Sequence, residues 1–130
     1  QNLKKSKFAL LPVKLDAVPG TVLDSILLDI PVITYKTTGM PYLNREKECV
    51  LLAEIGDIEG LANNMLKLMN DEVYAKVLAQ NAKEFVTRTF DNTTSAKRLV
   101  EDYKAVIAHY HNGTPIPKEL LFDLNEFPIY

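Results

Sequence analysis

Apolar and polar positions follow one another along this chain in the order expected of strands that alternate with helices. A short apolar run over residues 8–13 predicts a buried strand, and β-branched and aromatic residues over 31–35 predict a second. A third short apolar run covers residues 49–53. Between the first two strands, residues 21–28 carry apolar side chains three and four positions apart, which predicts a crossover helix. The pattern therefore predicts an α/β fold, with a parallel sheet of about three strands and helices packed on it.

The second half of the chain predicts three consecutive helices. Asp57 is expected to cap a helix over 58–69 and Asp71 one over 72–89, while Asn92 or Thr93 is expected to cap a third that ends at Asn112-Gly113. We expect the apolar stripe of each helix to face the core. The expected core positions are Val22, Leu23, Ile26 and Leu27; Ile58, Leu61, Ala62, Met65, Leu66 and Met69; Val73, Val77, Leu78, Phe85 and Val86; and Ala96, Leu99, Val100, Tyr103, Val106, Ile107 and Tyr110.

Composition narrows the class of protein. With 130 residues, 47% of them hydrophobic, the chain is long enough to bury the core of one domain. A net charge of -2 argues against a partner such as a nucleic acid, which needs a concentrated basic face. The single cysteine, Cys49, excludes an internal disulfide and is typical of a reducing compartment. Neither a stretch long enough to span a bilayer nor a secretory signal is recognisable, so we expect a cytoplasmic location.

Two carboxylates eight positions apart, Asp16 and Asp24, flank the turn Pro19-Gly20 between the first strand and its helix. At the carboxyl end of a parallel strand, a glycine turn lets backbone N–H groups approach an anion, and the amino end of the helix adds a partial positive charge. Carboxylates beside such a turn can accept hydrogen bonds from sugar hydroxyls. On these residues alone an alternative stays open, in which Asp16 is a turn residue and Asp24 an exposed helix position.

Other chemistries find no support in the sequence. His109 and His111 are two positions apart, so on a helix they point about 200° away from each other and cannot share a metal ion. Ser25 has no histidine nearby to activate it. The chain has no paired-cysteine, dinucleotide-binding or phosphate-loop motif. We therefore expect no catalytic side chain and no metal site in this chain.

Taken in order, these motifs resemble the donor-sugar-nucleotide signature of group 1 glycosyltransferases with the GT-B fold. That signature reads roughly Pro-Ser, Glu-x7-Glu-Ala, Gly-x-Pro-Val-Ile, followed by Gly-Gly-x-Pro-Glu and Gly-Asp…Leu-Ala. This chain has Asp in place of both glutamates, Asp29 in place of a helix-ending Gly, and Tyr42 in place of the last Glu. The matching positions are Pro12-Val13, Asp16, Asp24-Ser25, Asp29, Pro31-Val32-Ile33, Thr38-Gly39-Met40-Pro41, Ile55-Gly56-Asp57 and Leu61-Ala62.

The resemblance implies a domain organisation and a donor site. Residues 1–112 would form an incomplete Rossmann-like donor-binding subdomain of a truncated GT-B C-terminal domain, followed by a tail over 113–130. The N-terminal acceptor domain of the parent chain would be the missing partner. In the implied site, Asp16 would bind a donor-sugar hydroxyl and Asp24 the ribose hydroxyls. The N–H groups of Gly20, Thr21 and Val22 would bind the diphosphate. Thr38, Gly39, Met40 and Pro41 would border the same crevice.

The resemblance also implies a function. The parent enzyme would bind a nucleotide diphosphate sugar and transfer a hexose to an acceptor hydroxyl with retention, without a metal or other cofactor, in the cytoplasm at the inner membrane surface. The basic residues that the family places against the diphosphate would precede Gln1, so we expect no turnover by these 130 residues alone. The alternative hypothesis is a non-catalytic α/β interaction module that forms a homodimer through an exposed sheet edge. We expect the apolar tail over 114–130 to pack on its own domain or on a partner surface.

Overall fold

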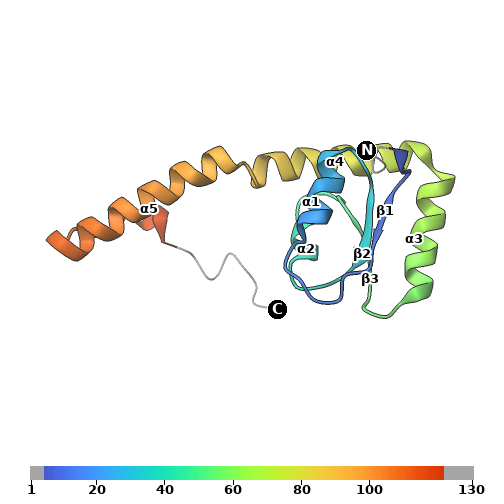
Figure 1. The fold of residues 1–130 in the computed structure, drawn as a ribbon, viewed down its shortest axis with the longest axis horizontal. Coiled ribbons are helices and arrows are strands. Elements are labelled where there is room, and N and C mark those ends of the chain that lie inside the picture. The colour runs from blue at the N-terminus through green and yellow to red at the C-terminus, as the bar shows by residue number, and fades with distance from the viewer. Residues whose placement is uncertain (1–4, 122–130) are drawn as a thin grey trace. The chain divides into compact units, whose positions relative to one another are not determined.

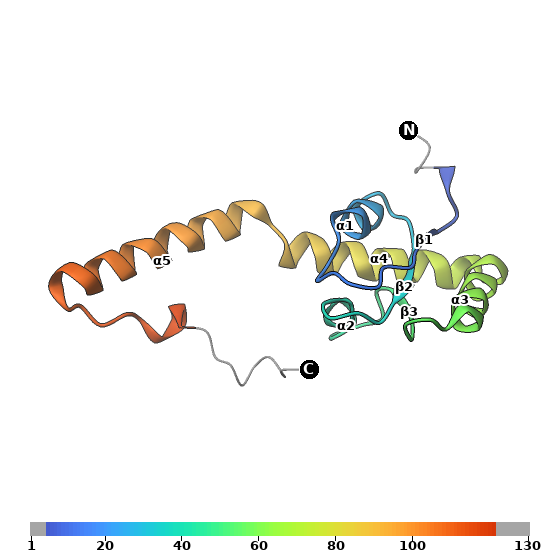
Figure 2. The ribbon, with the colours of Figure 1, turned by 60° about the horizontal axis from the view of Figure 1, so that its bottom comes forward.

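A computed structural model describes residues 5–121, and its internal contacts divide the chain between Thr89 and Phe90. Figures 1 and 2 show the ribbon in two views. The first unit contains β1 (Ala9–Leu11), α1 (Gly20–Leu27), β2 (Val32–Tyr35), α2 (Met40–Leu43), β3 (Leu51–Ala53), α3 (Ile58–Asn70) and α4 (Glu72–Thr89). The second contains α5 (Asn92–Asn112) and a short 3-10 helix, η2 (Lys118–Leu120).

The three strands form a parallel sheet in the order β1-β2-β3. Ala9 pairs with Val32, and Ile33 pairs with Leu51. This arrangement confirms the predicted α/β class and the crossover through α1. The loops that follow the strands gather at the lower end of the sheet in Figure 1, whereas α4 runs across the opposite end. Figure 2, in which the lower end comes forward, shows α4 behind the sheet. The carboxyl ends of the strands therefore lie at the end of the sheet opposite α4.

The sheet separates two apolar clusters because alternate residues of β2 point to opposite faces. Val32 belongs to the cluster that includes α1, α2 and the second half of α4, while Ile33 belongs to the cluster that includes α3 and the first half of α4. All four residues of β2 are buried, as expected of the central strand of a parallel sheet. Helix α4 thus contributes to both halves of the core.

The stripe predicted for α4 is confirmed in part. Leu78, Phe85 and Val86 are buried, but Val73 and Val77 are 74% and 47% exposed. The rest of the buried face consists of alanines, which let the helix approach the sheet closely. These are Ala75, Ala79 and Ala82. A search for regularly spaced large apolar side chains does not find them.

The stripes of α1 and α3 are also rotated from their predicted positions. In α1, Val22 and Ile26 are buried, but Leu27 is exposed. In α3, Leu61 is buried together with Leu68, which the prediction omitted, because residues separated by seven positions lie on one helix face. The predicted core positions that are exposed in α3 are Ile58, Ala62, Leu66 and Met69.

The helix starts follow the predicted capping chemistry with one correction. Asp57 accepts a hydrogen bond from the Gly60 N–H at 2.8 Å, and Asp71 caps α4 in the same way. The cap of α5 is Asp91, which accepts from the N–H groups of Thr93 and Thr94, so the prediction of Asn92 or Thr93 is wrong. The helix ends as predicted, because Gly113 adopts the left-handed conformation with φ 67°.

The segment predicted as a loop over residues 37–44 contains a short helix, α2. Pro41 lies in its first turn, where a missing N–H costs no hydrogen bond, so this proline starts a helix instead of breaking one. Asn44 ends it and organises the return to β3. Its Oδ1 accepts from the N–H groups of Cys49 and Val50 at 2.8 and 2.9 Å, and its Nδ2 donates to the Val50 carbonyl.

The second unit differs from its prediction. No residue of α5 is buried, so the core stripe predicted over 96–110 is wrong for this unit. The division of contacts after Thr89 also falls earlier than the boundary expected at residue 112. Of the tail over 114–130, the described part ends at Leu121, which is 55% exposed, and the remaining apolar tail positions lie outside the described residues. The assignment of residues 1–112 to a donor subdomain stays a prediction.

Candidate functional site

The loops after β1 and β2 touch each other at the carboxyl end of the sheet. The Thr38 hydroxyl donates a hydrogen bond to the Asp16 carbonyl oxygen at 2.8 Å. Gly39 packs against the backbone of Ala17 so closely that a Cβ atom would lie 2.1 Å from the Ala17 carbonyl oxygen. The structure therefore brings together the two stretches of sequence that the prediction assigned to one site, and it explains why the second requires glycine.

Helix α1 presents two backbone amides at this end of the sheet. The N–H groups of Gly20 and Thr21 have no hydrogen-bond acceptor in the described part of the chain, as is usual for the first turn of a helix. A Cβ atom built on Gly20 meets nothing within 4 Å, so the space above this turn is open. The third predicted amide differs, because the Val22 N–H donates to the Pro19 carbonyl oxygen at 3.0 Å and the Val22 side chain is fully buried. Two amides, not three, are available to an anion.

Asp24 lies one turn along α1 from Gly20, on the same helix face. It is exposed, and with Thr21 and Ser25 it lines a cavity of about 380 Å³ whose other wall is β1. The walls are largely apolar, and the Ser25 hydroxyl is taken up by a hydrogen bond to the Thr21 carbonyl at 2.8 Å. A carboxylate at the rim of an apolar cavity can accept hydrogen bonds from hydroxyl groups while a planar apolar group occupies the interior.

The remaining predicted site residues differ in how exposed they are. Asp16 is exposed on the loop after β1, next to Leu15, which is 89% exposed. Thr38 is exposed and Pro41 half-buried. Met40 is fully buried in the core, so its side chain is not available to a ligand, and the expectation that residues 38–41 border the crevice stays a prediction for the backbone there.

The environments of two neighbouring residues, Thr37 and Tyr42, were not predicted from the sequence. The Thr37 hydroxyl oxygen is buried at the end of β2 with no hydrogen-bond partner in the described residues, although such groups are usually paired. Tyr42, in the position of the family's Glu, packs edge-on against Phe85 with ring centroids 5.8 Å apart. The Arg45 guanidinium lies 4.4 Å from the centre of the Tyr42 ring. Tyr42 therefore holds α2 against α4. The prediction of a loop over residues 37–44 could not show this role.

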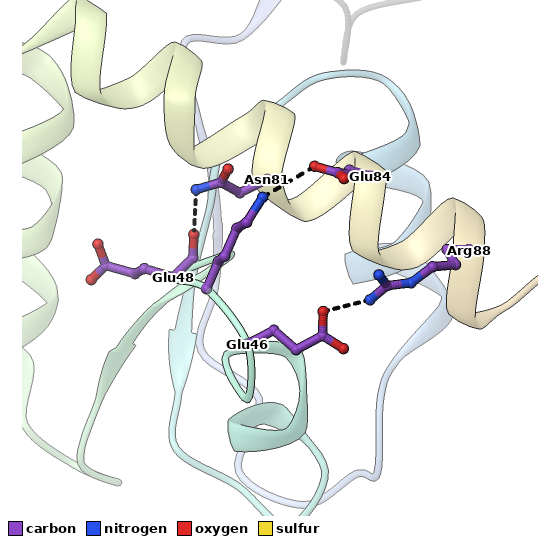
Figure 3. Close-up of polar contacts among 6 residues, drawn as sticks. Glu46, Glu48, Asn81, Glu84 and Arg88 are labelled. Atoms are coloured by element: carbon purple, nitrogen blue, oxygen red, sulfur yellow. Dashed lines mark hydrogen bonds and ion pairs between the residues drawn. The ribbon is translucent and has the colours of Figure 1, made fainter.

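A second polar cluster joins the segment before β3 to α4 (Figure 3). Arg88 pairs with Glu46 at 2.6 Å, and its hydrogen bond and positive charge lower the pKa of Glu46. Lys47 pairs with Glu84 at 3.4 Å, and Asn81 donates to the Glu48 carbonyl at 3.3 Å. The charged groups are exposed, and exposed ion pairs contribute little to stability. The cluster lies beside the amino end of β3, not at the carboxyl ends of the strands, and holds the segment before β3 in place.

Cys49 lies next to this cluster and is 1% exposed. Burial raises the pKa of its thiol to about 11, and nearby carboxylates such as Glu46 add to the effect. A thiol that stays protonated at neutral pH is a poor nucleophile and a poor metal ligand. Across residues 5–121, no group of three or more His, Cys, Asp or Glu side chains is placed to hold a metal ion. None of the described helices is long and apolar enough to cross a membrane.

A family model described as glycosyl transferases group 1 matches residues 1–85 of the chain. The chain belongs to the group 1 glycosyltransferases. No curated protein matches it. The match covers the whole sheet, both loops of the candidate site and α1, and it ends within α4, so it does not include α5.

Membership of this family confirms the resemblance drawn from the motifs, and the parallel sheet agrees with a partial Rossmann-like domain of the GT-B type. It assigns the chain a role in glycosyl transfer, with a sugar donor and an acceptor as substrates. The match does not test the roles expected of Asp16 and Asp24, which lie on the loop after β1 and on α1 and stay predictions. Asp29 adopts φ 61° and pairs with Lys83 at 2.6 Å.

Proposed function

We propose that this chain is the donor-binding portion of a hexosyltransferase, which holds a nucleotide diphosphate sugar at the carboxyl end of its sheet. The observation that carries the proposal is the contact of Thr38 and Gly39 with the loop of Asp16 and Ala17, since it joins two separate motifs into one surface. The cavity beside Asp24 lies along the same helix as the free amides. One ligand with a diphosphate between two hydroxyl-bearing rings fits this combination.

In this proposal each group has a physical role in the departure of the diphosphate. Negative charge grows on the leaving diphosphate during transfer, and aligned N–H dipoles at a helix start stabilise it. The amides of Gly20 and Thr21 would supply them, while Asp24 accepts from ribose hydroxyls and Asp16 from the sugar. Both carboxylates are one methylene shorter than the family's glutamates, so we expect weak binding. The basic residues that the family places against the diphosphate have no counterpart in these 130 residues, so we expect no turnover by them alone. No metal or other cofactor is part of this proposal.

A titration of the labelled chain with UDP-glucose and GDP-mannose, followed by amide chemical shifts, tests the proposal. We expect saturable shifts confined to residues 9–11, 16–25 and 37–41, which include the wall of the cavity formed by β1. Asp24→Asn should weaken binding because it removes the charge that accepts hydroxyl hydrogen bonds, while Glu72→Gln is the matched control on an exposed carboxylate at the other end of the sheet. Shifts outside these residues, or equal loss in both variants, would contradict the proposed site. Transfer of sugar by this chain would contradict the expected lack of turnover.

A second candidate function, an interaction module, is favoured by the free side of β1. In the described sheet β1 pairs only with β2, Leu10 is 38% exposed, and the cavity along β1 is largely apolar. Such an edge can add a strand from another chain. Amide shifts along residues 9–11 that depend on protein concentration and not on added nucleotide would favour this function over donor binding.

A further inference from the structure

Lys36 follows β2 at the carboxyl end of the sheet and is held there at two points. Its N–H donates to the Ala53 carbonyl oxygen at 2.7 Å, so the ladder with β3 continues to this residue. Its Nζ pairs with Glu54 at 3.2 Å, and both side chains are more than half exposed. An exposed ion pair contributes little to stability because water screens it. Another anion can therefore replace Glu54 beside Lys36 at little cost.

The pleat of β2 places the Lys36 side chain on the face of the sheet that α1 covers. Val32 packs in the cluster that includes α1, and a residue four positions further along a strand points to the same face. Helix α1 contacts β2 and, as the crossover helix, runs back along it, so its first turn lies at the carboxyl end of β2. The loop that begins at Lys36 contacts the loop of Asp16 two residues later. Lys36 and the free amides of Gly20 and Thr21 therefore share one end and one face of the sheet.

We propose that Lys36 is the cation that binds the diphosphate of the donor, and that a phosphate oxygen replaces Glu54 as its partner. This inference rests on the proposed function and adds a residue that is neither in the predicted site nor among the basic residues implied by the family resemblance. A diphosphate carries more than one negative charge, whereas the start of a helix supplies about half of a positive charge. The carboxylates of Asp16 and Asp24 make a cation more necessary. An ammonium group donates three hydrogen bonds and is a common phosphate ligand.

A second lysine, Lys14, follows β1 at the same end of the sheet and is exposed. Lys36 is the better candidate because the ladder fixes its backbone, so less conformational entropy is lost when its side chain binds an anion. Glu54 gives the proposal a sign that can be measured. Its carboxylate competes with the diphosphate for Lys36 and repels the diphosphate, so removal of that charge should strengthen anion binding.

A titration of the complete 130-residue chain with inorganic pyrophosphate tests this role without the nucleoside or the sugar. Lys36→Gln should weaken binding by about tenfold, because it removes a charge-assisted hydrogen bond. Glu54→Gln should strengthen binding by about threefold, because it removes the competitor. Lys76→Gln is the matched control and should leave binding unchanged, since it breaks a similar exposed pair, with Glu72 at 3.5 Å, on α4 at the other end of the sheet.

Binding is followed by the amide signals of Gly20 and Thr21 and by the methylene signal next to the Lys36 Nζ. The side chain is observed because the Lys36 N–H stays bonded to the Ala53 carbonyl. The amide spectrum of each variant checks that the fold is kept. A purely structural ion pair would give the same change for Lys36→Gln and Glu54→Gln. That result, or a larger loss from Lys14→Gln than from Lys36→Gln, would overturn the proposal.

UDP-glucose, titrated into the same variants, separates this inference from the proposed function. Equal affinity for the unchanged chain and for Lys36→Gln would overturn the role of Lys36 and leave the donor site in place. Pyrophosphate binding that depends on Lys36, with no additional shifts at residues 9–11 or at Asp24 from UDP-glucose, would support Lys36 and contradict the donor site. Absence of binding by either ligand would overturn both.

Discussion

Helices α4 and α5 look alike in sequence but differ in what they bury. Both are long, both begin at an aspartate, and both carry an apolar stripe at helical spacing. Yet α4 buries six residues against the sheet, α1 and α3, whereas α5 buries none. The comparison shows that periodicity specifies which face of a helix is apolar but does not specify what covers that face. For α4 the partner is in the same unit, whereas the described residues leave the stripe of α5 exposed.

The largest expected effect compares one aromatic residue from each helix. Phe85→Ala should lower the free energy of unfolding of the first unit by about 3–5 kcal/mol, because it leaves a cavity in a packed core. Tyr103→Ala, which removes a side chain that is 61% exposed, should change it by less than about 0.5 kcal/mol. Denaturant unfolding of the dilute chain measures both. Similar losses would show that α5 packs as tightly as α4 does.

The next effect compares two glycines at the candidate site. Gly39→Ala should cost about 1–3 kcal/mol, because its Cβ atom would collide with the Ala17 backbone and separate the two loops. Gly20→Ala has open space and should change stability by less than about 1 kcal/mol. Thermal unfolding of the two variants provides the test. Equal stability of both would mean that the loops do not pack as described.

A smaller loss is expected from the cap of α3. Asp57→Ala removes the acceptor for the Gly60 N–H and should lower the free energy of unfolding by about 1 kcal/mol. Asp57→Asn keeps a side-chain oxygen in place and should retain most of that stability. Denaturant unfolding of the pair separates loss of the cap from loss of charge. An equal loss in both variants would assign the effect to the charge.

The smallest effect concerns the start of α5 in acid. Hydrogen bonds from Thr94, by its hydroxyl and its N–H, and from the Thr93 N–H lower the pKa of Asp91 in the folded state. The contribution of this cap is therefore present above the ordinary pKa of aspartate and is lost as the pH falls through the lowered value. Amide exchange at Thr93 and Thr94 should accelerate in acid, beyond the intrinsic pH trend. Asp91→Asn should remove that dependence, and its persistence in the variant would contradict this origin.

Much of the first unit could be predicted from the sequence because its signals are local. The strands and α1 follow from short apolar runs, and α3 and α4 follow from their apolar periodicity and their aspartate caps. The sequence did not show which side of each helix is buried. In α4 the buried side includes Ala75, Ala79 and Ala82, which carry no strong hydrophobic signal. In α3 the leucines at 66 and 68 are chemically identical, so the sequence does not show which of them faces the core. Helix α2 was missed because Pro41 is compatible both with a loop and with a first helical turn.

The candidate site was predictable only as far as its place in the fold. The family resemblance implied that the loops of Asp16 and Thr38 lie side by side, and the hydrogen bond between them shows that the two loops touch, while their role in binding stays a prediction. The sequence could not show that the Val22 N–H is taken up by Pro19 or that Met40 turns into the core, because both depend on the path of the backbone. The contact of Gly39 with Ala17 likewise needs the two loops in space.

The side chain of Asn44 has a consequence for how this protein would age in storage. Its amide nitrogen donates to the Val50 carbonyl while its oxygen accepts two backbone N–H groups. Hydrolysis of the amide to an acid would leave the two accepted bonds in place but replace the donor by an oxygen facing a carbonyl oxygen, so the entry to β3 would loosen. Deamidation at this one position would therefore be expected to appear as a slow loss of order next to Cys49, long before the chain unfolds.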